Sequence, residues 1–144
     1  MYLIMTPPHL VERFYNEVWN RADEAVARAI LHPNLSFTGS LGRSLTGIDE
    51  FISYLHSIHA ALGNYTCDIV DLVTAETRAA AHMRFHGVHR GTFFGVPPTG
   101  RIIEWAGAAF FTIRQGQITE LWVLGDVDAV KQQLGLGAAS SFDC

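Results

Sequence analysis

A histidine and a carboxylate, His89 and Asp126, are the residues of this chain whose surroundings best suit proton-transfer chemistry. Both belong to the stretch from His86 to Asp126, which is otherwise rich in apolar and aromatic residues. A carboxyl group withdrawn from water can act as a general acid or base near neutral pH, and a histidine beside it can hydrogen-bond a carbonyl oxygen. The pair therefore predicts acid/base catalysis carried out by side chains alone.

Asp126 stands four residues after Trp122, so the two side chains point to the same face of a regular strand. If that face is the apolar interior, Asp126 is a candidate general acid/base and Trp122 a wall of the substrate site. Asp126 is equally well placed to cap a helix that begins at Val127, which is a common use of aspartate. The two roles are not exclusive, and the sequence leaves both open.

His89 shares strand parity with Met83 and Phe85, so an inward-facing Met83 and Phe85 imply an inward-facing His89. The alternative is a loop histidine whose ring nitrogens bond backbone groups. His82 and His86 fall on the opposite face and, at the rise of a strand, lie roughly 13 Å apart, too far to share a metal ion. We therefore expect no metal site, and no nucleotide or phosphate motif indicates a cofactor.

Helices and strands that would position these residues fall into two groups along the chain. Thr6-Pro7-Pro8 indicates a helix start, and apolar spacing extends that helix past Phe14 to Val18. Further helices are expected over residues 23–31 and from Gly47 to a C-terminal cap at Gly63. Four long strands rich in β-branched and aromatic residues follow, at 65–74, 78–88, 101–114 and 117–125.

Helices followed by long strands predict an α+β domain in which the helices pack on one face of a curved antiparallel sheet. The interior of a sheet curled around helices is either packed solid or hollowed into a pocket. Small residues at 79–81 and 107–109 share the strands with large aromatic ones, which favours a pocket. The residues expected to bind a substrate there are Phe14, Met83, Phe85, Trp105 and Trp122.

Composition limits the remaining possibilities. The chain has 144 residues, 49% of them hydrophobic, which fits one domain over residues 1–135 with a flexible tail over 136–144. Its net charge of −4 and its scattered basic residues argue against a nucleic-acid partner, and no apolar run is long enough to cross a membrane. Two cysteines make no disulfide framework, so we expect a reducing, cytoplasmic location.

Several motifs together resemble the SnoaL-like polyketide cyclase (ester cyclase) family of the nuclear transport factor 2-like superfamily. The resemblance covers nearly the whole chain. It is carried by His89-x-Gly91-x-Phe93-x-Gly95-Val96-Pro97-Pro98-Thr99-Gly100-Arg101, by Gly116-Gln117-Ile118-Thr119-Glu120-Leu121-Trp122 with Asp126, and by Gln133-Leu134-Gly135. The chain departs from the family pattern at Val88 and at Gly125, where glycine gives the backbone beside Asp126 more freedom.

The resemblance implies a cone-shaped α+β fold, an apolar pocket and a homodimer built on the outer face of the sheet. It also implies an intramolecular aldol-type cyclisation of an apolar carbonyl or polyketide-like small molecule, with Asp126 as acid/base, His89 in the pocket and no cofactor. Two alternatives stay open at this point. One is another cofactor-free reaction of the same fold (isomerisation, dehydration or epoxide opening), and the other is a non-catalytic ligand-binding or dimerisation module.

Overall fold

The computed structural model describes residues 6–136. In this range the chain forms four α-helices, one π-helical segment and six strands, in the following order along the chain: α1 (Pro7–Arg13), η1 (Phe14–Trp19), α2 (Glu24–Ile30), β1 (Leu31–Thr38), β2 (Ser44–Thr46), α3 (Ile48–Ala61), β3 (Leu62–Thr74), β4 (Arg78–His89), β5 (Ile102–Arg114), β6 (Gln117–Gly125) and α4 (Val127–Gln133). Residues 1–5, and 137–144 of the expected tail, lie outside the described residues. No helix within 6–136 is long and apolar enough to cross a membrane.

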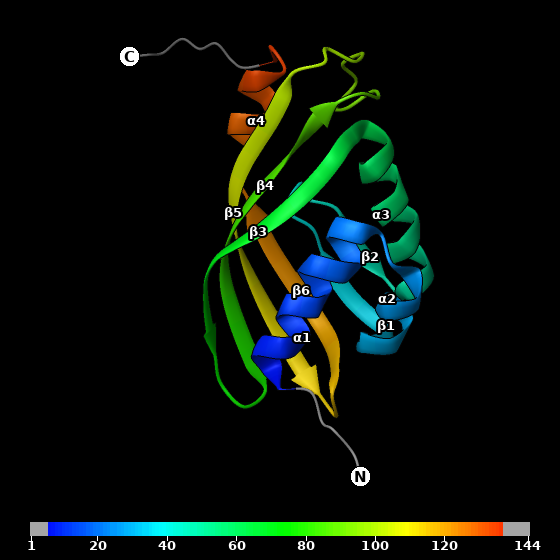
Figure 1. The fold of residues 1–144 in the computed structure, drawn as a ribbon, viewed down its shortest axis with the longest axis vertical. Helices are drawn as coiled ribbons and strands as arrows, with labels where there is room; N and C mark the ends of the chain where they lie inside the picture. The colour runs from blue at the N-terminus through cyan, green and yellow to red at the C-terminus, as the bar shows by residue number, and fades with distance from the viewer. Residues whose placement is uncertain (1–5, 137–144) are drawn as a thin grey trace.

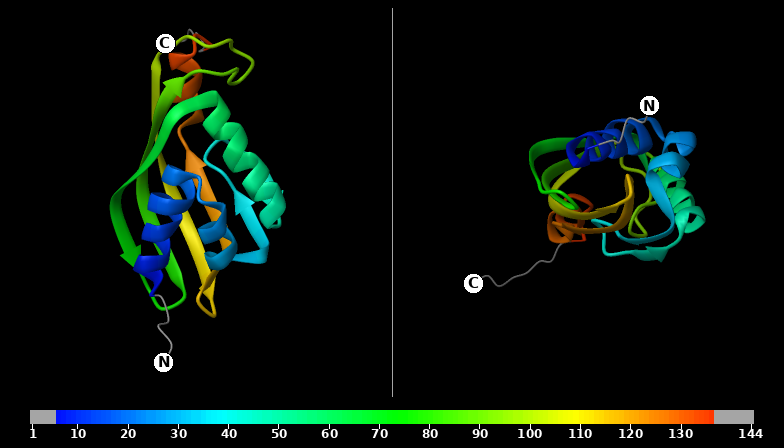
Figure 2. Two further views of the ribbon diagram at one scale, coloured as in Figure 1. Left: turned by 45° about the vertical axis from the view of Figure 1, so that its right-hand side comes forward. Right: turned by 90° about the horizontal axis from the view of Figure 1, so that it is seen from below.

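The six strands form one sheet in the order β2-β1-β6-β5-β4-β3. The sheet curls along its length, and α1, α2 and α3 lie against its concave side (Figure 1). Viewed from below, the strands and these helices surround a common interior (Figure 2). This is the predicted cone-shaped α+β fold, and its concave face carries the side chains that fill the core.

Strands β3 to β6 confirm the predicted meander, since each pairs antiparallel with the next. The complete sheet is mixed rather than antiparallel throughout, because β1, which was not predicted, runs parallel to β6. The sequence reading also missed β1 and β2 altogether. The dipeptide His32-Pro33 looks like a helix end followed by a loop, yet beyond it Leu35 and Phe37 alternate with exposed residues and are buried in β1.

The first predicted helix is present, but its second half is π-helical rather than α-helical. Residues Phe14–Trp19 form η1, and the backbone N–H of Asn20 donates to Tyr15 O, five residues back. Asn20 then fixes the end of this segment to β3: its side-chain amide donates to Cys67 O at 3.1 Å and accepts from Cys67 N at 2.7 Å. These two bonds hold η1 against the inner face of the sheet.

The predicted helix cap at Gly63 is wrong. Helix α3 ends at Ala61, Leu62 closes it in an extended conformation, and Gly63 already belongs to β3. The Arg90 side chain packs against Gly63, in space that a side chain at Gly63 would occupy, so this glycine serves strand packing rather than a helix end.

Candidate functional site

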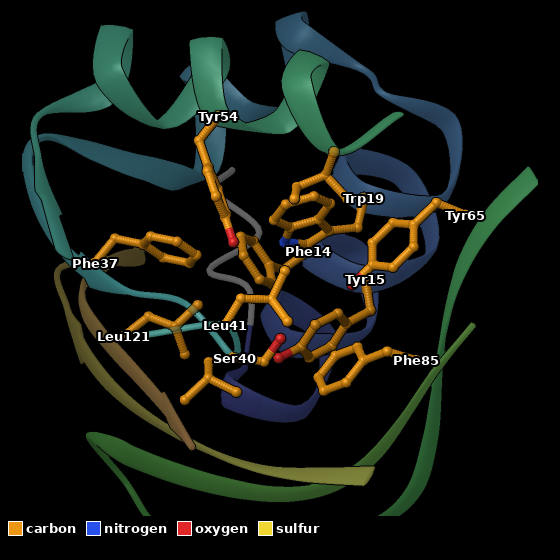
Figure 3. A pocket seen from close by; sticks show the side chains of 12 residues that line it. Phe14, Tyr15, Trp19, Phe37, Ser40, Leu41, Tyr54, Tyr65, Phe85 and Leu121 are labelled. Atoms are coloured by element: carbon orange, nitrogen blue, oxygen red, sulfur yellow. The ribbon is translucent and has the colours of Figure 1, made fainter. Parts of the chain in front are cut away.

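A cavity lies inside the cone, between η1, α3 and the inner face of the sheet (Figure 3). Its free volume is about 20 Å³, which is room for roughly one water molecule. The lining is mostly aromatic and aliphatic with a few hydroxyl groups, and consists of Phe14, Tyr15, Trp19, Phe37, Ser40, Leu41, Tyr54, Ile58, Tyr65, Phe85, Leu121 and Val123.

Two of the predicted substrate-binding residues, Phe14 and Phe85, line this cavity. Trp105 lies one layer behind it: the indole is buried, stacks on Tyr65 with ring centroids 6.0 Å apart, and donates a hydrogen bond from Nε1 to Ser40 Oγ at 3.2 Å. Met83 is fully buried and faces inward as predicted, but it is not part of the cavity wall.

The small residues that suggested a pocket do not create it. A side chain at Gly107 would collide with the ring of Phe85, so that space is already filled. Ala108 is exposed on the outer face of β5. None of these small residues lines the cavity, which is bounded by side chains from η1, α3, the turn after β1 and the inner face of the sheet.

Trp122 faces away from the cavity, contrary to the prediction. It is 44% exposed and packs beside Phe110 on the outer face of the sheet, with ring centroids 5.9 Å apart. Its neighbours in β6, Leu121 and Val123, are the buried ones and line the cavity. The prediction placed Trp122 on the inner face of β6, whereas the structure places it on the outer face.

Asp126 follows the same parity and is exposed. Its Oδ1 accepts a hydrogen bond from the backbone N–H of Ala129 at 3.1 Å, so the carboxylate caps the N-terminus of α4. The face that Asp126 shares with Trp122 is the outer one, and the condition for a water-excluded acid/base at this position is not met. Of the two roles considered for Asp126, the capping role is present in the structure.

His89 faces inward, as parity predicted, and is completely buried. Its Nδ1 lies 2.9 Å from Thr99 Oγ1 and accepts from Thr99 N at 3.3 Å, while its Nε2 donates to Val96 O at 3.1 Å. Backbone bonds between His89 and the 100–101 segment close the same turn. Both ring nitrogens are thus engaged in holding the Pro-Pro-Thr-Gly turn, and His89 lies outside the cavity lining.

The hydroxyl groups of the cavity were missed by the sequence reading. Tyr15 shares the apolar spacing of the first helix, which indicates only that it packs inward; its position next to Phe14, a predicted substrate-binding residue, is the signal that could have identified it. Tyr54 likewise lies on the apolar side of its helix, α3, where the sequence indicates only packing. Ser40 lies in a short turn between β1 and β2, two strands that were not predicted.

Burial controls the ionisation of these hydroxyls. It raises the pKa of Tyr15 and of Tyr65 well above the ordinary value, and it raises the pKa of Tyr54 to about 12. All three therefore stay protonated at neutral pH and can donate hydrogen bonds. No carboxylate, imidazole or cationic side chain within residues 6–136 lines the cavity, and no cluster of metal-ligating side chains occurs in that range.

The turn that carries Ser40 is held against the end of β6. Its backbone closes through Gly39 N to Arg43 O at 2.8 Å. A side chain at Gly125 would overlap the carbonyl oxygen of Ser40, so glycine at this position is what lets the turn approach the sheet. Gly125, read from the sequence as a source of backbone freedom beside Asp126, is a contact point for the cavity wall.

The sequence model of the SnoaL-like polyketide cyclases matches residues 9–134. The chain belongs to this family. Structures similar to this SnoaL-like protein include TsrD from Streptomyces laurentii, with 24% identity, a TM-score of 0.80 and coverage of 90% of this chain and 95% of that one. No curated protein matches the sequence.

Two further similar structures come from other bacteria. A SnoaL-like polyketide cyclase from Agrobacterium tumefaciens has 22% identity and a TM-score of 0.76, covering 91% of this chain and 99% of that one. A candidate polyketide cyclase from Xanthomonas campestris has 29% identity and a TM-score of 0.74, covering 87% and 93% of the two chains. These SnoaL-like structures share the fold over nearly their full lengths.

Proposed function

We propose that this SnoaL-like protein binds an apolar, carbonyl-bearing small molecule inside the cone and acts on it as a cofactor-independent enzyme of the cyclase or isomerase type. The observation that carries the proposal is the aromatic cavity with protonated tyrosine hydroxyls, in a chain of the SnoaL-like family. Aromatic walls suit a flat apolar ligand, and protonated hydroxyls can stabilise the negative charge that develops on a carbonyl oxygen as a neighbouring proton passes to a base. No carboxylate or imidazole within residues 6–136 lines the cavity, so in this proposal the proton passes to water or to Asp126, the acid/base that the family resemblance implies.

A cavity of about 20 Å³ is much smaller than a typical ligand site of roughly 300–1,000 Å³. Binding therefore requires the wall to move. The part of the wall best suited to move is the turn with Ser40 and Leu41, because it is a short connection, whereas the rest of the lining belongs to helices and strands.

Proton abstraction next to a carbonyl can be tested without knowledge of the natural substrate. The protons of 2-tetralone between its ring and its carbonyl group exchange with deuterium, and NMR follows that exchange. We expect the protein to accelerate the exchange relative to buffer and to bovine serum albumin at equal concentration. Binding of 2-tetralone without any acceleration would contradict the enzymatic part of the proposal.

The second candidate function is a ligand-binding module without catalysis. It is supported by one specific observation: both ionisable residues expected to do chemistry, Asp126 and His89, make structural hydrogen bonds outside the cavity. The family resemblance supports an acid/base role for Asp126, whereas its exposure favours the cap alone.

Two substitutions at Asp126 separate these roles. Asp126→Asn keeps an oxygen that accepts from Ala129 N but cannot transfer a proton, while Asp126→Ala removes the cap at a cost of about 1 kcal/mol. If Asp126 only caps α4, the asparagine variant exchanges 2-tetralone protons at the wild-type rate. A large loss of exchange in a normally stable asparagine variant would establish the acid/base role.

We further propose that a second copy of this chain covers the outer face of the sheet. Phe110, Trp122 and Leu124 are 42%, 44% and 61% exposed and lie together there, because Phe110 pairs with Trp122 across β5 and β6 and Leu124 follows on the same side of β6. Clustered exposed hydrophobic side chains of this size are typical of protein interfaces. Sedimentation equilibrium over a range of concentrations tests this proposal.

A further inference from the structure

The hydroxyl of Tyr15 is a buried polar group without a hydrogen-bond partner in the described part of the chain. The side chain is 1% exposed, and because burial raises its pKa the hydroxyl keeps its proton and remains a donor. Figure 3 shows it pointing into the cavity, towards Ser40. Leaving a buried donor unpaired costs folding free energy, so this hydroxyl does not stabilise the fold. It is available to donate a hydrogen bond to a bound molecule.

The backbone that carries Tyr15 is unusual as well. η1 is π-helical, a conformation that is rare and is frequently found at functional sites. Three residues of this one segment, Phe14, Tyr15 and Trp19, line the cavity. Two features that each reduce stability, a π-helical turn and an unpaired buried hydroxyl, therefore coincide at Tyr15.

Ser40 supplies a second hydroxyl to the same cavity. Its Oγ accepts the indole N–H of Trp105 at 3.2 Å, which orients the side chain and leaves its own hydrogen free to be donated. Within residues 6–136 the Ser40 side chain makes no other hydrogen bond, and Figure 3 shows its hydroxyl near the centre of the cavity. Tyr15 and Ser40 thus offer two donors from opposite walls, one from η1 and one from the turn after β1.

We infer that Tyr15 and Ser40 form a two-donor site for a neutral carbonyl oxygen of the ligand. A carbonyl oxygen has two lone pairs and can accept from both hydroxyls at once. The lining has no cationic group, so a carboxylate would lose its hydration without gaining a partner. The inference rests on the proposed function, since it specifies which ligands the cavity accepts and which residues select them.

A pair of probes that differ only in the carbonyl group tests the site. Titrations with 2-tetralone and with tetralin, followed by the methyl resonances of Val123 in the cavity wall, give a dissociation constant for each. We expect the wild-type protein to bind 2-tetralone about five- to tenfold more tightly than tetralin, which corresponds to one net hydrogen bond. We expect Tyr15→Phe and Ser40→Ala each to remove most of this preference while tetralin binds as before.

Folding of the variants is checked by thermal unfolding. Tyr15→Phe removes an unpaired hydroxyl and should leave the melting temperature unchanged or raise it. Ser57→Ala is the matched control, because Ser57 donates to Tyr54 O outside the cavity, and it should keep the preference for the ketone. 2-Naphthoate, an aromatic carboxylate of similar size, should bind more weakly than 2-tetralone.

Four results would overturn the inference, and they differ in whether the proposed function survives. Equal affinity for 2-tetralone and tetralin in the wild-type protein, or a ketone preference that survives in Tyr15→Phe, refutes the two-donor site but leaves a ligand-binding cavity. Tighter binding of 2-naphthoate than of 2-tetralone refutes selection for a neutral oxygen. If neither 2-tetralone nor tetralin shifts the Val123 methyl resonances, the proposed function and the inference both fail.

Discussion

Replacement of His89 is the sharpest test of whether this buried histidine holds the fold or performs chemistry. The ring makes contacts with Val96 O and with both the hydroxyl and the backbone N–H of Thr99, at 2.9–3.3 Å. His89→Ala removes these bonds, leaves Val96 O with the backbone N–H of Phe93 as its remaining partner, and opens a space beside Phe93, whose ring centroid lies 6.2 Å from that of the imidazole.

The expected loss follows from these contacts. Two to three net hydrogen bonds of about 1 kcal/mol each, together with the cost of the space left behind, predict that the free energy of unfolding falls by about 3 kcal/mol. With a urea m-value of about 2 kcal/mol/M, the unfolding midpoint falls by about 1.5 M. The measurement is urea unfolding followed by tryptophan fluorescence.

His82→Ala is the matched control, because His82 lies on the same strand but is exposed on the outer face. It should change the free energy of unfolding by less than about 0.5 kcal/mol. The hydrogen bonds also require that His89 carries its proton on Nε2, which nitrogen-15 chemical shifts can verify. If His89→Ala is destabilised by less than 1 kcal/mol and yet loses 2-tetralone exchange, His89 acts on the ligand and the structural interpretation is wrong.

Alkaline pH should destabilise the protein, because burial raises the folded-state pKa of Tyr15, Tyr54 and Tyr65 above their unfolded value near 10. Below pH 10 both states hold these tyrosine protons. Above pH 10 only the unfolded state loses them, so stability falls by about 1.4 kcal/mol per pH unit and tyrosine. The thiol of Cys67, whose pKa burial also raises, adds a similar slope, so Tyr15→Phe should reduce the slope measured by urea unfolding above pH 10 by about a quarter. Trp122→Glu should convert a dimer into a monomer in sedimentation equilibrium without loss of stability, and an unchanged mass would refute the dimer interface. Gly125→Ala should displace the Ser40 turn and weaken 2-tetralone binding about tenfold or more in NMR titrations; unchanged affinity would mean that the turn adapts freely.

The part of the fold encoded in local patterns was predictable. Strands β4, β5 and β6 alternate buried and exposed residues, short turns join β3 to β4 and β5 to β6, and α3 has a clear apolar face, so their positions follow from periodicity. β1 was not predicted because its antiparallel partner β2 has only three residues, which is too short for a clear strand pattern, and its other partner, β6, lies some 80 residues away along the chain. The π-helical form of η1 was not predicted because its apolar spacing is also compatible with an ordinary α-helix.

The site was harder to predict because it depends on which face of each strand turns inward. Parity worked for Met83, Phe85 and His89, which are all buried. It failed for Trp122, since a large aromatic residue suggested the core although its neighbours Leu121 and Val123 occupy it. A large aromatic side chain in a sequence usually indicates a buried core position. A dimer interface also selects such side chains, so in the sequence of a single chain an interface residue cannot be distinguished from a core residue.

The end of β6 illustrates how a family pattern and a local structure can point to different roles at neighbouring residues. The pattern directs attention to Asp126, which is exposed and caps α4. The preceding residue, Gly125, contacts the cavity indirectly: its lack of a side chain admits the Ser40 turn, and Ser40 in turn is oriented by the indole of Trp105. The end of β6 therefore affects the cavity through the packing of Gly125 against the Ser40 turn and through the hydroxyl group of Ser40. A substitution at Gly125 should change which ligands bind, whereas Asp126→Asn should leave binding unchanged, and this contrast distinguishes the two roles within a single pair of adjacent positions.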